Sequence, residues 1–279
     1  MTRSQQELLR HYGIRPVKRR GQNFLLDGNL ARAIAADALA LGDEILELGA
    51  GGGALTVHLL DGARTLACVE VDRGLYALLQ GEFGDRPGFR AILGDLTRLD
   101  WEEALAAAGP RPVIAGNLPY VLTSLVLFKA ADLRERIAGA VFMIQKEVAA
   151  RLVAEPGGRD YGVLAVVLGS VFTIRQSRTV PASVFWPRPQ VHSAVVSLTP
   201  AGDMPDLEFA WFREVVKRMF GQRRKQVSSQ LRTQFDLSPA EAEAVAVAAG
   251  LDPGARPEQV APGGYRRLAR LLEPKEVCR

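Results

Sequence analysis

Short runs of apolar residues recur along the first part of the chain, to about residue 155, with amphipathic stretches between them. The runs are short and rich in leucine and β-branched residues, which is typical of buried strands. Strands that alternate with helices predict an α/β fold with a doubly wound, mostly parallel sheet. We expect strands at 44–49, 65–70, 89–94, 113–116 and 141–144, a helix at 29–41 before the first strand, and another at 147–153.

The pattern changes after residue 155. A helix at 161–168 and two strands at 171–174 and 194–198, paired as a hairpin, are expected before a proline-bounded linker at 200–205. Beyond the linker, apolar residues recur at helical spacing, and Ser238 followed by Pro239 is typical of a helix start. The expected helices are 209–220, 224–234, 239–249 and 263–272. We therefore predict two domains, residues 1–200 and a small helical domain of residues 201–279.

Composition is that of an ordinary globular protein. The 279 residues are 48% hydrophobic and 24% charged, enough to bury a substantial core. No apolar stretch is long enough to span a membrane, and residues 1–20 lack the apolar core of a secretion signal. The two cysteines imply no disulfide framework, and the three histidines have no metal-ligand spacing. We expect a cytoplasmic protein, a monomer without a metal or a membrane partner.

A glycine-rich loop follows the first expected strand. Gly49, Gly51 and Gly53 lie two residues apart in a Glu-x-Gly-x-Gly-x-Gly-x-Leu-Thr sequence. Glycines let the backbone turn tightly from strand to helix, and they let a ligand approach where a Cβ would collide. Two cofactor classes fit such a loop, the nicotinamide dinucleotides and S-adenosylmethionine. The dinucleotide pattern places its third glycine at a position that is Ala54 here.

Acidic side chains end the next two expected strands. Glu70 follows the loop by about 20 residues, a position suited to bind both ribose hydroxyls of an adenosine-type cofactor. Asp95 ends the third strand and can accept a hydrogen bond from an adenine amine, while the adenine packs on apolar neighbours such as Leu96. We therefore predict that Gly49, Gly51, Glu70, Asp95 and Leu96 bind the cofactor.

The turn Asn117-Leu118-Pro119-Tyr120 follows the fourth strand and is the most informative feature of the chain. The amine of a base is a poor nucleophile until acceptors bind its N–H groups and favour a tetrahedral nitrogen. The Asn117 side chain and the Leu118 carbonyl can supply two acceptors, because proline locks the turn and biases the preceding residue to an extended conformation. Tyr120 can stack on the base, worth roughly 1–3 kcal/mol. The loop, the two acids and this turn, in this order, indicate a methyltransferase.

Basic residues gather near both ends of the sequence. Residues 1–20 carry six, among them Arg19 and Arg20, and residues 213–232 carry seven, among them Arg223, Arg224 and Lys225. A charge run is often a solvated surface, but beside a base-methylating site it favours contact with a nucleic-acid backbone. Since Arg223, Arg224 and Lys225 are adjacent, they would fan out on a helix and could not all meet one phosphate.

With these motifs, the chain resembles the bacterial 16S ribosomal RNA adenine N6-dimethyltransferases (the KsgA or RsmA family) over almost its whole length. The sequence Gly21-Gln22-Asn23-Phe24-Leu25 resembles the family's opening motif, and Phe185-x-Pro-x-Pro-x-Val-x-Ser resembles its late motif. The segment from Phe220 to Lys225 resembles a sequence in the C-terminal domain of that family. The resemblance implies a Rossmann-like class I methyltransferase sheet, cofactor contacts from Asn23, Leu25 and Asn117, and a Phe185 ring that closes on the target base.

The same resemblance implies S-adenosylmethionine as donor and two adjacent adenosines, in the hairpin near the 3′ end of 16S ribosomal RNA in the small subunit, as acceptors. A role in subunit biogenesis would follow. The Erm-type resistance enzymes, which methylate large-subunit RNA, share every catalytic motif and stay open as an alternative. An NAD-dependent oxidoreductase would explain the glycine loop and Glu70, but not the turn at Asn117. A non-catalytic RNA-binding assembly factor would explain only the basic residues.

Overall fold

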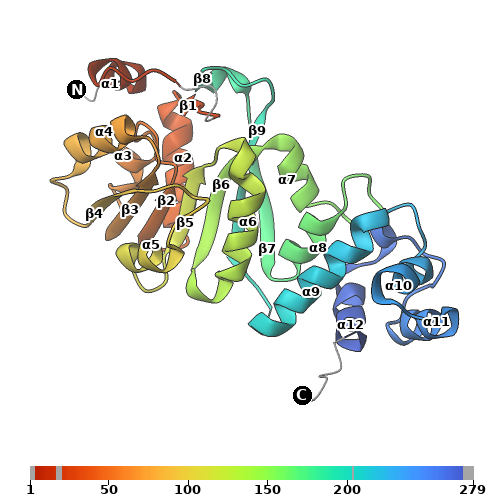
Figure 1. The fold of residues 1–279 in the computed structure, drawn as a ribbon. Coiled ribbons are helices and arrows are strands. Elements are labelled where there is room, and N and C mark those ends of the chain that lie inside the picture. Colours follow the sequence, from red (N-terminus) through yellow and green to blue (C-terminus); the bar gives the residue numbers. More distant parts are fainter. Residues whose placement is uncertain (1–3, 17–20, 203, 273–279) are drawn as a thin grey trace. The chain divides into compact units, whose positions relative to one another are not determined.

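The computed structural model describes residues 4–16, 21–202 and 204–272. Its elements follow the chain from red to blue in Figure 1. The chain divides into two compact units, one of residues 1–149 with 174–200 and the other of residues 150–173 with 201–279. The division differs from the domains predicted from the sequence in one segment, 150–173, which groups with the C-terminal helices.

A seven-stranded sheet forms the centre of the first unit, in the order β4-β3-β2-β5-β6-β9-β7. Neighbouring strands from β4 through β6 run parallel, and β9 pairs antiparallel with β6. The strands are β2 (Glu44–Leu48), β3 (Thr65–Glu70), β4 (Phe89–Leu93), β5 (Val113–Asn117), β6 (Gly139–Gln145), β7 (Phe172–Val180) and β9 (Ser193–Pro200). The predicted doubly wound, mostly parallel sheet is confirmed, as is the pairing of its last two strands.

Strand order reverses between β2 and β5, which lie side by side although two strands separate them in the sequence. In open α/β sheets, ligands bind at the carboxyl ends of the strands beside such a reversal. The fold thus brings the ends of β2, β3, β4 and β5 to one edge of the sheet. Each of the candidate motifs at Gly49, Glu70, Asp95 and Asn117 lies at one of these ends.

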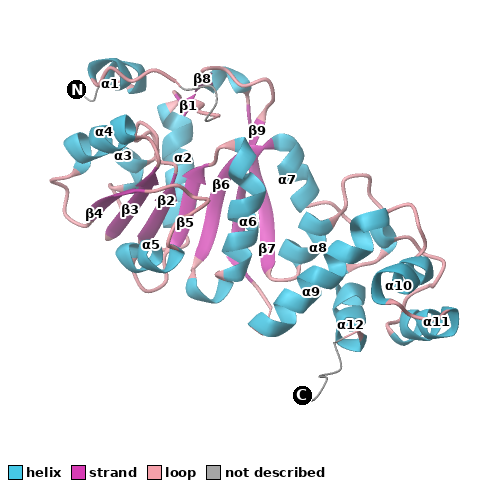
Figure 2. Cartoon of the chain, viewed as in Figure 1, coloured by secondary structure: helices cyan, strands magenta, loops and turns pink. Residues whose placement is uncertain are grey.

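Helices cover both faces of this sheet, with α2 behind it and α6 in front in Figure 2. Asp27, Asp72 and Asp100 begin α2, α4 and α5 by accepting backbone N–H groups of the first turn at 2.8–3.2 Å. The α-helices up to residue 152 are α1 (Gln5–His11), α2 (Gly28–Leu39), α3 (Thr56–Leu59), α4 (Arg73–Phe83), α5 (Trp101–Ala108), α6 (Thr123–Asp132) and α7 (Lys146–Leu152).

The core of this unit follows the period of two that strands impose. Leu66 with Cys68, and Val113 with Ala115, point to one face of the sheet and pack with Ile34 of α2 in the same buried cluster. All five are 0–1% exposed. Packing of this face against α2 therefore holds the strands, and with them the site residues at their ends, in place.

Two short strands lie apart from the main sheet, β1 (Phe24–Leu25) and β8 (Phe185–Trp186). They pair antiparallel, with Phe24 opposite Trp186 and Leu25 opposite Phe185. The Phe24 and Trp186 rings stack at 6.3 Å between centroids, whereas Leu25 and Phe185 lie in the core. The opening motif and the late motif of the sequence are thus joined in space.

The second unit is helical, and its inner helix α8 (Val163–Gly169) contacts α9 and α12. The Tyr161 hydroxyl donates to the Val260 carbonyl at 2.9 Å, and the Tyr265 hydroxyl donates to the Pro257 carbonyl at 2.7 Å. Both rings are fully buried, so these bonds satisfy polar groups inside the unit. Its other helices are α9 (Asp206–Met219), α10 (Val227–Phe235), α11 (Pro239–Ala248) and α12 (Pro262–Leu271).

The helix predicted at 224–234 begins three residues later than expected. Arg223, Arg224 and Lys225 lie in a turn between the short 3-10 helix Phe220–Gln222 and α10, so they do not fan out on a helix. Gln226 is extended, and Val227 donates its N–H to the Ala255 carbonyl at 2.8 Å. This bond to a distant loop ends the turn and begins the helix, which sequence periodicity could not show.

Candidate active site

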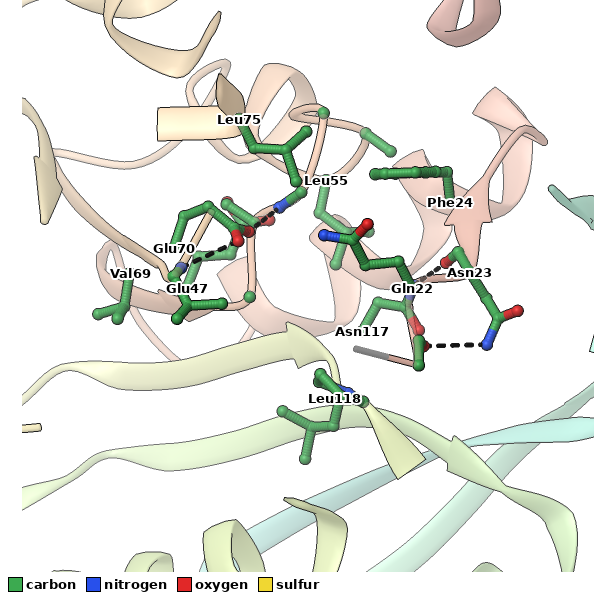
Figure 3. Close-up of a pocket in the computed structure, with 18 of the residues that line it drawn as sticks. Gln22, Asn23, Phe24, Glu47, Leu55, Val69, Glu70, Leu75, Asn117 and Leu118 are labelled. Atoms are coloured by element: carbon green, nitrogen blue, oxygen red, sulfur yellow. Dashed lines mark hydrogen bonds between the residues drawn. The ribbon is translucent and has the colours of Figure 1, made fainter. Parts of the chain in front are cut away.

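A cavity opens at the carboxyl ends of β2, β3, β4 and β5, where the strand order reverses (Figure 3). The opening motif of the chain lies on its opposite side, through residues 21–25. The predicted site residues that line it are Asn23, Leu25, Gly49, Gly51, Glu70, Asp95, Leu96, Asn117, Leu118, Pro119 and Tyr120. The structure thus brings together every predicted cofactor residue and the whole turn at 117–120.

The glycine loop after β2 needs glycine for its backbone conformation. Gly49, Gly51 and Gly53 have φ values of 68°, 57° and 83°, which favour glycine. A Cβ on Gly51 would lie 3.6 Å from the Phe24 ring, so the loop packs directly under that ring. Space that a side chain would fill is thereby left open beside Glu70.

Glu70 ends β3 and is held by backbone N–H groups. One carboxylate oxygen accepts from Gly51, and the other accepts from Val71 and Asp72, each at 2.9 Å. The side chain is 5% exposed, and this burial raises its pKa, while the three N–H groups oppose the rise. These bonds fix the carboxylate at the cavity wall. Since a carboxylate has about four acceptor positions, one remains for a ligand hydroxyl.

Asp95 lies just beyond β4 at the same edge and is exposed. The backbone N–H and the hydroxyl of Thr97 both donate to its Oδ1 at 2.8 Å, and these bonds lower its pKa. The carboxylate is therefore ionised and oriented, and Oδ2 is available to accept from an amine. Leu96 beside it is buried and gives the cavity an apolar wall.

Asn117, the last residue of β5, has a fixed amide. Its Nδ2 donates to the Asn23 backbone carbonyl at 3.0 Å, and Asn23 Nδ2 donates to the Gly21 carbonyl at 3.2 Å. Because the Asn117 nitrogen is committed to a carbonyl, its Oδ1 is left as the acceptor in the cavity. The following residue is anchored as well, since Leu118 N donates to the Met143 carbonyl at 3.2 Å.

Tyr120 is half-buried, and its hydroxyl hydrogen-bonds Ser193 Oγ at 2.9 Å. Burial raises the Tyr120 pKa, the bond to Ser193 lowers it, and the nearby Glu147 carboxylate raises it. Ser193 begins β9, opposite Gln145 of β6, and is fully buried. The hydroxyl bond therefore ties the ring to a rigid strand. No role was predicted for Ser193, although it ends the late Phe-x-Pro-x-Pro-x-Val-x-Ser motif.

Phe185 does not take the predicted place at the target base. It is 4% exposed, packs in the core and does not line the cavity. The reason is the alternation of strand side chains: Phe185 points inward from β8, while the next residue, Trp186, points outward and is 39% exposed. The prediction that Phe185 closes on a base is therefore not supported by its position.

Glu47 is a buried carboxyl of the cavity for which no role was predicted. It is 1% exposed and accepts from the Thr56 hydroxyl at 2.7 Å and the Cys68 thiol at 3.2 Å. Burial raises its pKa to about 7, with a smaller contribution from the Glu70 carboxylate. Glu47 is the first residue of the Glu-x-Gly-x-Gly pattern, so its place in that motif was the signal for it.

Among the predicted RNA-binding residues, Arg223 has partners inside its own unit. Its guanidinium donates to the Tyr161 carbonyl at 2.9 Å and lies 6.0 Å from the Phe220 ring. Arg224 and Lys225 are exposed beside it. The predicted residues Arg19 and Arg20 lie outside the described residues.

The family model of the ribosomal RNA adenine dimethylases matches residues 16–272. The chain belongs to this family. Its members transfer methyl groups to adenine in ribosomal RNA, so this family member is an S-adenosylmethionine-dependent methyltransferase, as the motifs predicted. Among the helices that the structure describes, none is both long and apolar enough to cross a membrane.

Relatives from bacteria align with this protein over nearly its whole length. It is 42% identical to the "Ribosomal RNA small subunit methyltransferase A" of Anaeromyxobacter sp. (strain K), an alignment that covers 96% of this chain and 98% of that one. It is 40% identical to the protein of that name from Myxococcus xanthus, with 97% and 96% covered.

Solved structures of two relatives share the fold. The 23S rRNA methyltransferase ErmE aligns at a TM-score of 0.67 and 25% identity, with 90% of this chain and all of that chain (100%) covered. A dimethyladenosine transferase from Plasmodium falciparum aligns at a TM-score of 0.72 and 19% identity, with 88% and 95% covered. These alignments agree with a class I methyltransferase sheet that carries a helical C-terminal part.

Proposed function

We propose that the protein dimethylates N6 of two adjacent adenosines in the hairpin near the 3′ end of small-subunit ribosomal RNA, as a step of subunit biogenesis. The observation that carries the chemistry is the Asn117 amide, whose nitrogen is bound by Asn23 so that its oxygen is left to accept from a base amine. The choice of subunit is supported by relatives of about 40% identity that are named small-subunit methyltransferases.

The cavity fits S-adenosylmethionine by its donor and acceptor set. Glu70, held by three backbone N–H groups, keeps one acceptor position for a ribose hydroxyl. Asp95 keeps one oxygen for the adenine amine, and Leu96 offers the ring an apolar wall. Gly49 and Gly51 let the donor lie against the backbone, and Asn23 and Leu25 close the opposite side.

Bound S-adenosylmethionine supplies a methyl group on a sulfonium, which an amine nitrogen can attack directly in line. The protein's task is to make the adenine amine a better nucleophile and to hold it in line. Asn117 Oδ1 and the Leu118 carbonyl accept its N–H groups and so favour a tetrahedral nitrogen with an available lone pair. Positioning and preorganised acceptors of this kind supply most of the acceleration.

The turn also orients the base and needs no strong general base. Tyr120, held by Ser193, presents its ring for stacking, and Pro119 keeps the turn rigid. The methylated amine is charged and loses its proton to solvent. The monomethylated base retains one N–H, so it can rotate, keep one acceptor contact and receive a second methyl group.

The RNA would be held largely through its phosphates. We assign Arg224 and Lys225, with Arg223 and the N-terminal Arg19 and Arg20, to backbone contacts, since basic clusters supply most of the salt-dependent affinity for RNA. Binding to an assembling ribosomal subunit would place the protein in the cytoplasm, and one copy per site is sufficient.

The main alternative is methylation of the large subunit. It is considered because the chain is also 25% identical to ErmE, a 23S rRNA methyltransferase. Small and large subunits that lack adenine methylation, incubated separately with labelled S-adenosylmethionine, would decide between the two. We expect label only on the small subunit, at two neighbouring adenosines that primer extension or mass spectrometry would locate. Label on the large subunit would overturn the assignment of the substrate.

A further inference from the structure

Helix α1 lies over the candidate donor cavity and is firmly packed there. Leu8 and Leu9 are buried in one cluster with Phe24 of the opening motif and Leu75 of α4. Ser4 caps the helix through reciprocal bonds with Glu7. These contacts fix the direction in which the side chains of α1 point. An N-terminal helix that precedes every recognised motif is thus part of the wall of the cavity.

Gln5, the first residue of α1, lines this cavity. Its Nε2 is buried and has no hydrogen-bond partner among the described residues. The amide lies against the glycine loop, since a Cβ on Gly52 would collide with Nε2. The next residue, Gln6, is exposed on the same helix. Buried side-chain donors in native proteins are nearly always satisfied, so an unpaired one beside a ligand cavity calls for a ligand acceptor.

The charges of the cavity indicate which acceptor this is. Its described wall contains the carboxyl groups of Glu47, Glu70 and Asp95 but no lysine, arginine or histidine. The acids can receive the hydroxyl and amine donors of S-adenosylmethionine. The carboxylate of S-adenosylmethionine, in contrast, needs N–H donors. Because the described wall has no basic side chain, those donors must be amide groups. Of the other side-chain amides in the wall, those of Asn23 and Asn117 are already bound to backbone carbonyls, and Gln22 also has an interaction of its own.

We propose that Gln5 Nε2 donates a hydrogen bond to the carboxylate of the amino-acid part of S-adenosylmethionine, which makes α1 a binding element of the donor site. The proposal rests on the assignment of this cavity to the donor. A hydrogen bond from a neutral amide to a carboxylate is charge-assisted and stronger than one between neutral groups. Its loss should therefore be measurable in the affinity for the cofactor.

Calorimetry with two ligands tests the contact. S-adenosylhomocysteine carries the carboxylate, whereas 5′-methylthioadenosine has the same adenosine part without it. Gln5→Ala should weaken S-adenosylhomocysteine by about tenfold and leave 5′-methylthioadenosine within about twofold. Gln5→Glu, which sets a second carboxylate against the first, should weaken S-adenosylhomocysteine further. Gln6→Ala is the matched control on the same helix and should change neither ligand.

Any other result would overturn the proposal, and the pattern of affinities would show why. Unchanged S-adenosylhomocysteine affinity in Gln5→Ala would show that Nε2 makes no bond to the ligand, and tighter binding would show that the side chain obstructs the cavity. Equal losses for both ligands would exclude the carboxylate as the partner. Failure of the wild-type protein to bind S-adenosylhomocysteine would instead refute the assignment of the cavity. Melting temperatures measured without ligand will show whether α1 stays packed in each variant.

Discussion

The side chain of Asn117, at the end of β5, donates to the backbone carbonyl of Asn23, which lies 94 residues earlier in the chain, at 3.0 Å. This bond ties the turn at 117–120 to the opening motif and fixes which end of the amide faces the cavity. The cavity proposed for the methyl donor and the turn proposed to hold the target base are thereby joined directly.

Asn117→Ala removes the oxygen that would accept from the target amine. We expect methyl transfer to fall by about 100-fold or more, or about 2.7 kcal/mol of transition-state stabilisation, while affinity for S-adenosylhomocysteine stays within a fewfold. Asn117→Asp keeps an oxygen but loses the donor to Asn23, so we expect it to be similarly impaired. Single-turnover rates with saturating cofactor measure both. Near wild-type turnover in Asn117→Ala would refute the role, and a loss confined to binding would make Asn117 a donor-site residue.

Glu70→Ala removes the carboxylate assigned to the ribose. We expect S-adenosylmethionine and S-adenosylhomocysteine to weaken by similar factors, because both carry the same ribose. The loss should exceed about tenfold, as for a hydrogen bond to a charged group. Calorimetry with both ligands and with NADH checks the result. Binding of NADH without binding of S-adenosylhomocysteine by the wild-type protein would refute the donor assignment and favour the oxidoreductase.

Ser193→Ala tests whether the bond to Tyr120 positions the stacking ring. We expect kcat to fall by about fivefold, corresponding to about 1 kcal/mol for one hydrogen bond, with cofactor affinity unchanged. If the two hydroxyls act only through each other, Tyr120→Phe should have the same effect and the double variant should be no worse than either. Ser193→Thr keeps the hydroxyl and should restore most of the rate. Additive losses would show that the two residues act separately.

The sheet and its ligand edge could be predicted from the sequence because their signals are local. Strand runs, glycines and strand-end acids lie within a few residues of one another, and the order of the motifs then follows from the topology of the fold. The position of Phe185 could not be predicted, since its direction depends on pairing with Leu25, 160 residues earlier. A motif identifies such a residue but does not say which way it points.

Long-range contacts also explain why the sequence pattern does not group residues 150–173 with the C-terminal helices, as the structure does. Gly157 donates its N–H to the Glu258 carbonyl, and Tyr161 bonds the Val260 carbonyl about 100 residues away. The place of Gln5 at the cavity could not be predicted for the same reason. Its neighbour Gly52 is remote in sequence, and Gln5 belongs to no motif. Partners far apart along the chain leave no periodic signal.

Glu47 should make the stability of the protein depend on pH. Its pKa is raised to about 7 in the folded protein, against an ordinary value of 4.5, so the folded state binds the proton more tightly than the unfolded state. Its contribution is fully present below about pH 4.5 and is lost as the pH rises through 7. Glu47→Gln should flatten this decline and raise stability at pH 8 by up to about 3 kcal/mol relative to wild type. Urea unfolding from pH 5 to 8 measures the difference, and parallel curves would contradict it.

The basic turn before α10 should contribute to RNA affinity through phosphates. Arg224→Ala with Lys225→Ala should reduce the log–log salt slope of subunit binding by about one to two units, at roughly 0.7–0.9 per lost phosphate contact. Arg223→Ala has a second effect, since its guanidinium also bonds the Tyr161 carbonyl, so we expect that variant alone to lower the melting temperature. Affinity for S-adenosylhomocysteine should not change in any of these variants, because residues of the first unit alone line the proposed donor cavity. Filter binding over a range of salt concentrations measures the slope. An unchanged slope in the correctly folded double variant would mean that Arg224 and Lys225 form only a solvated surface.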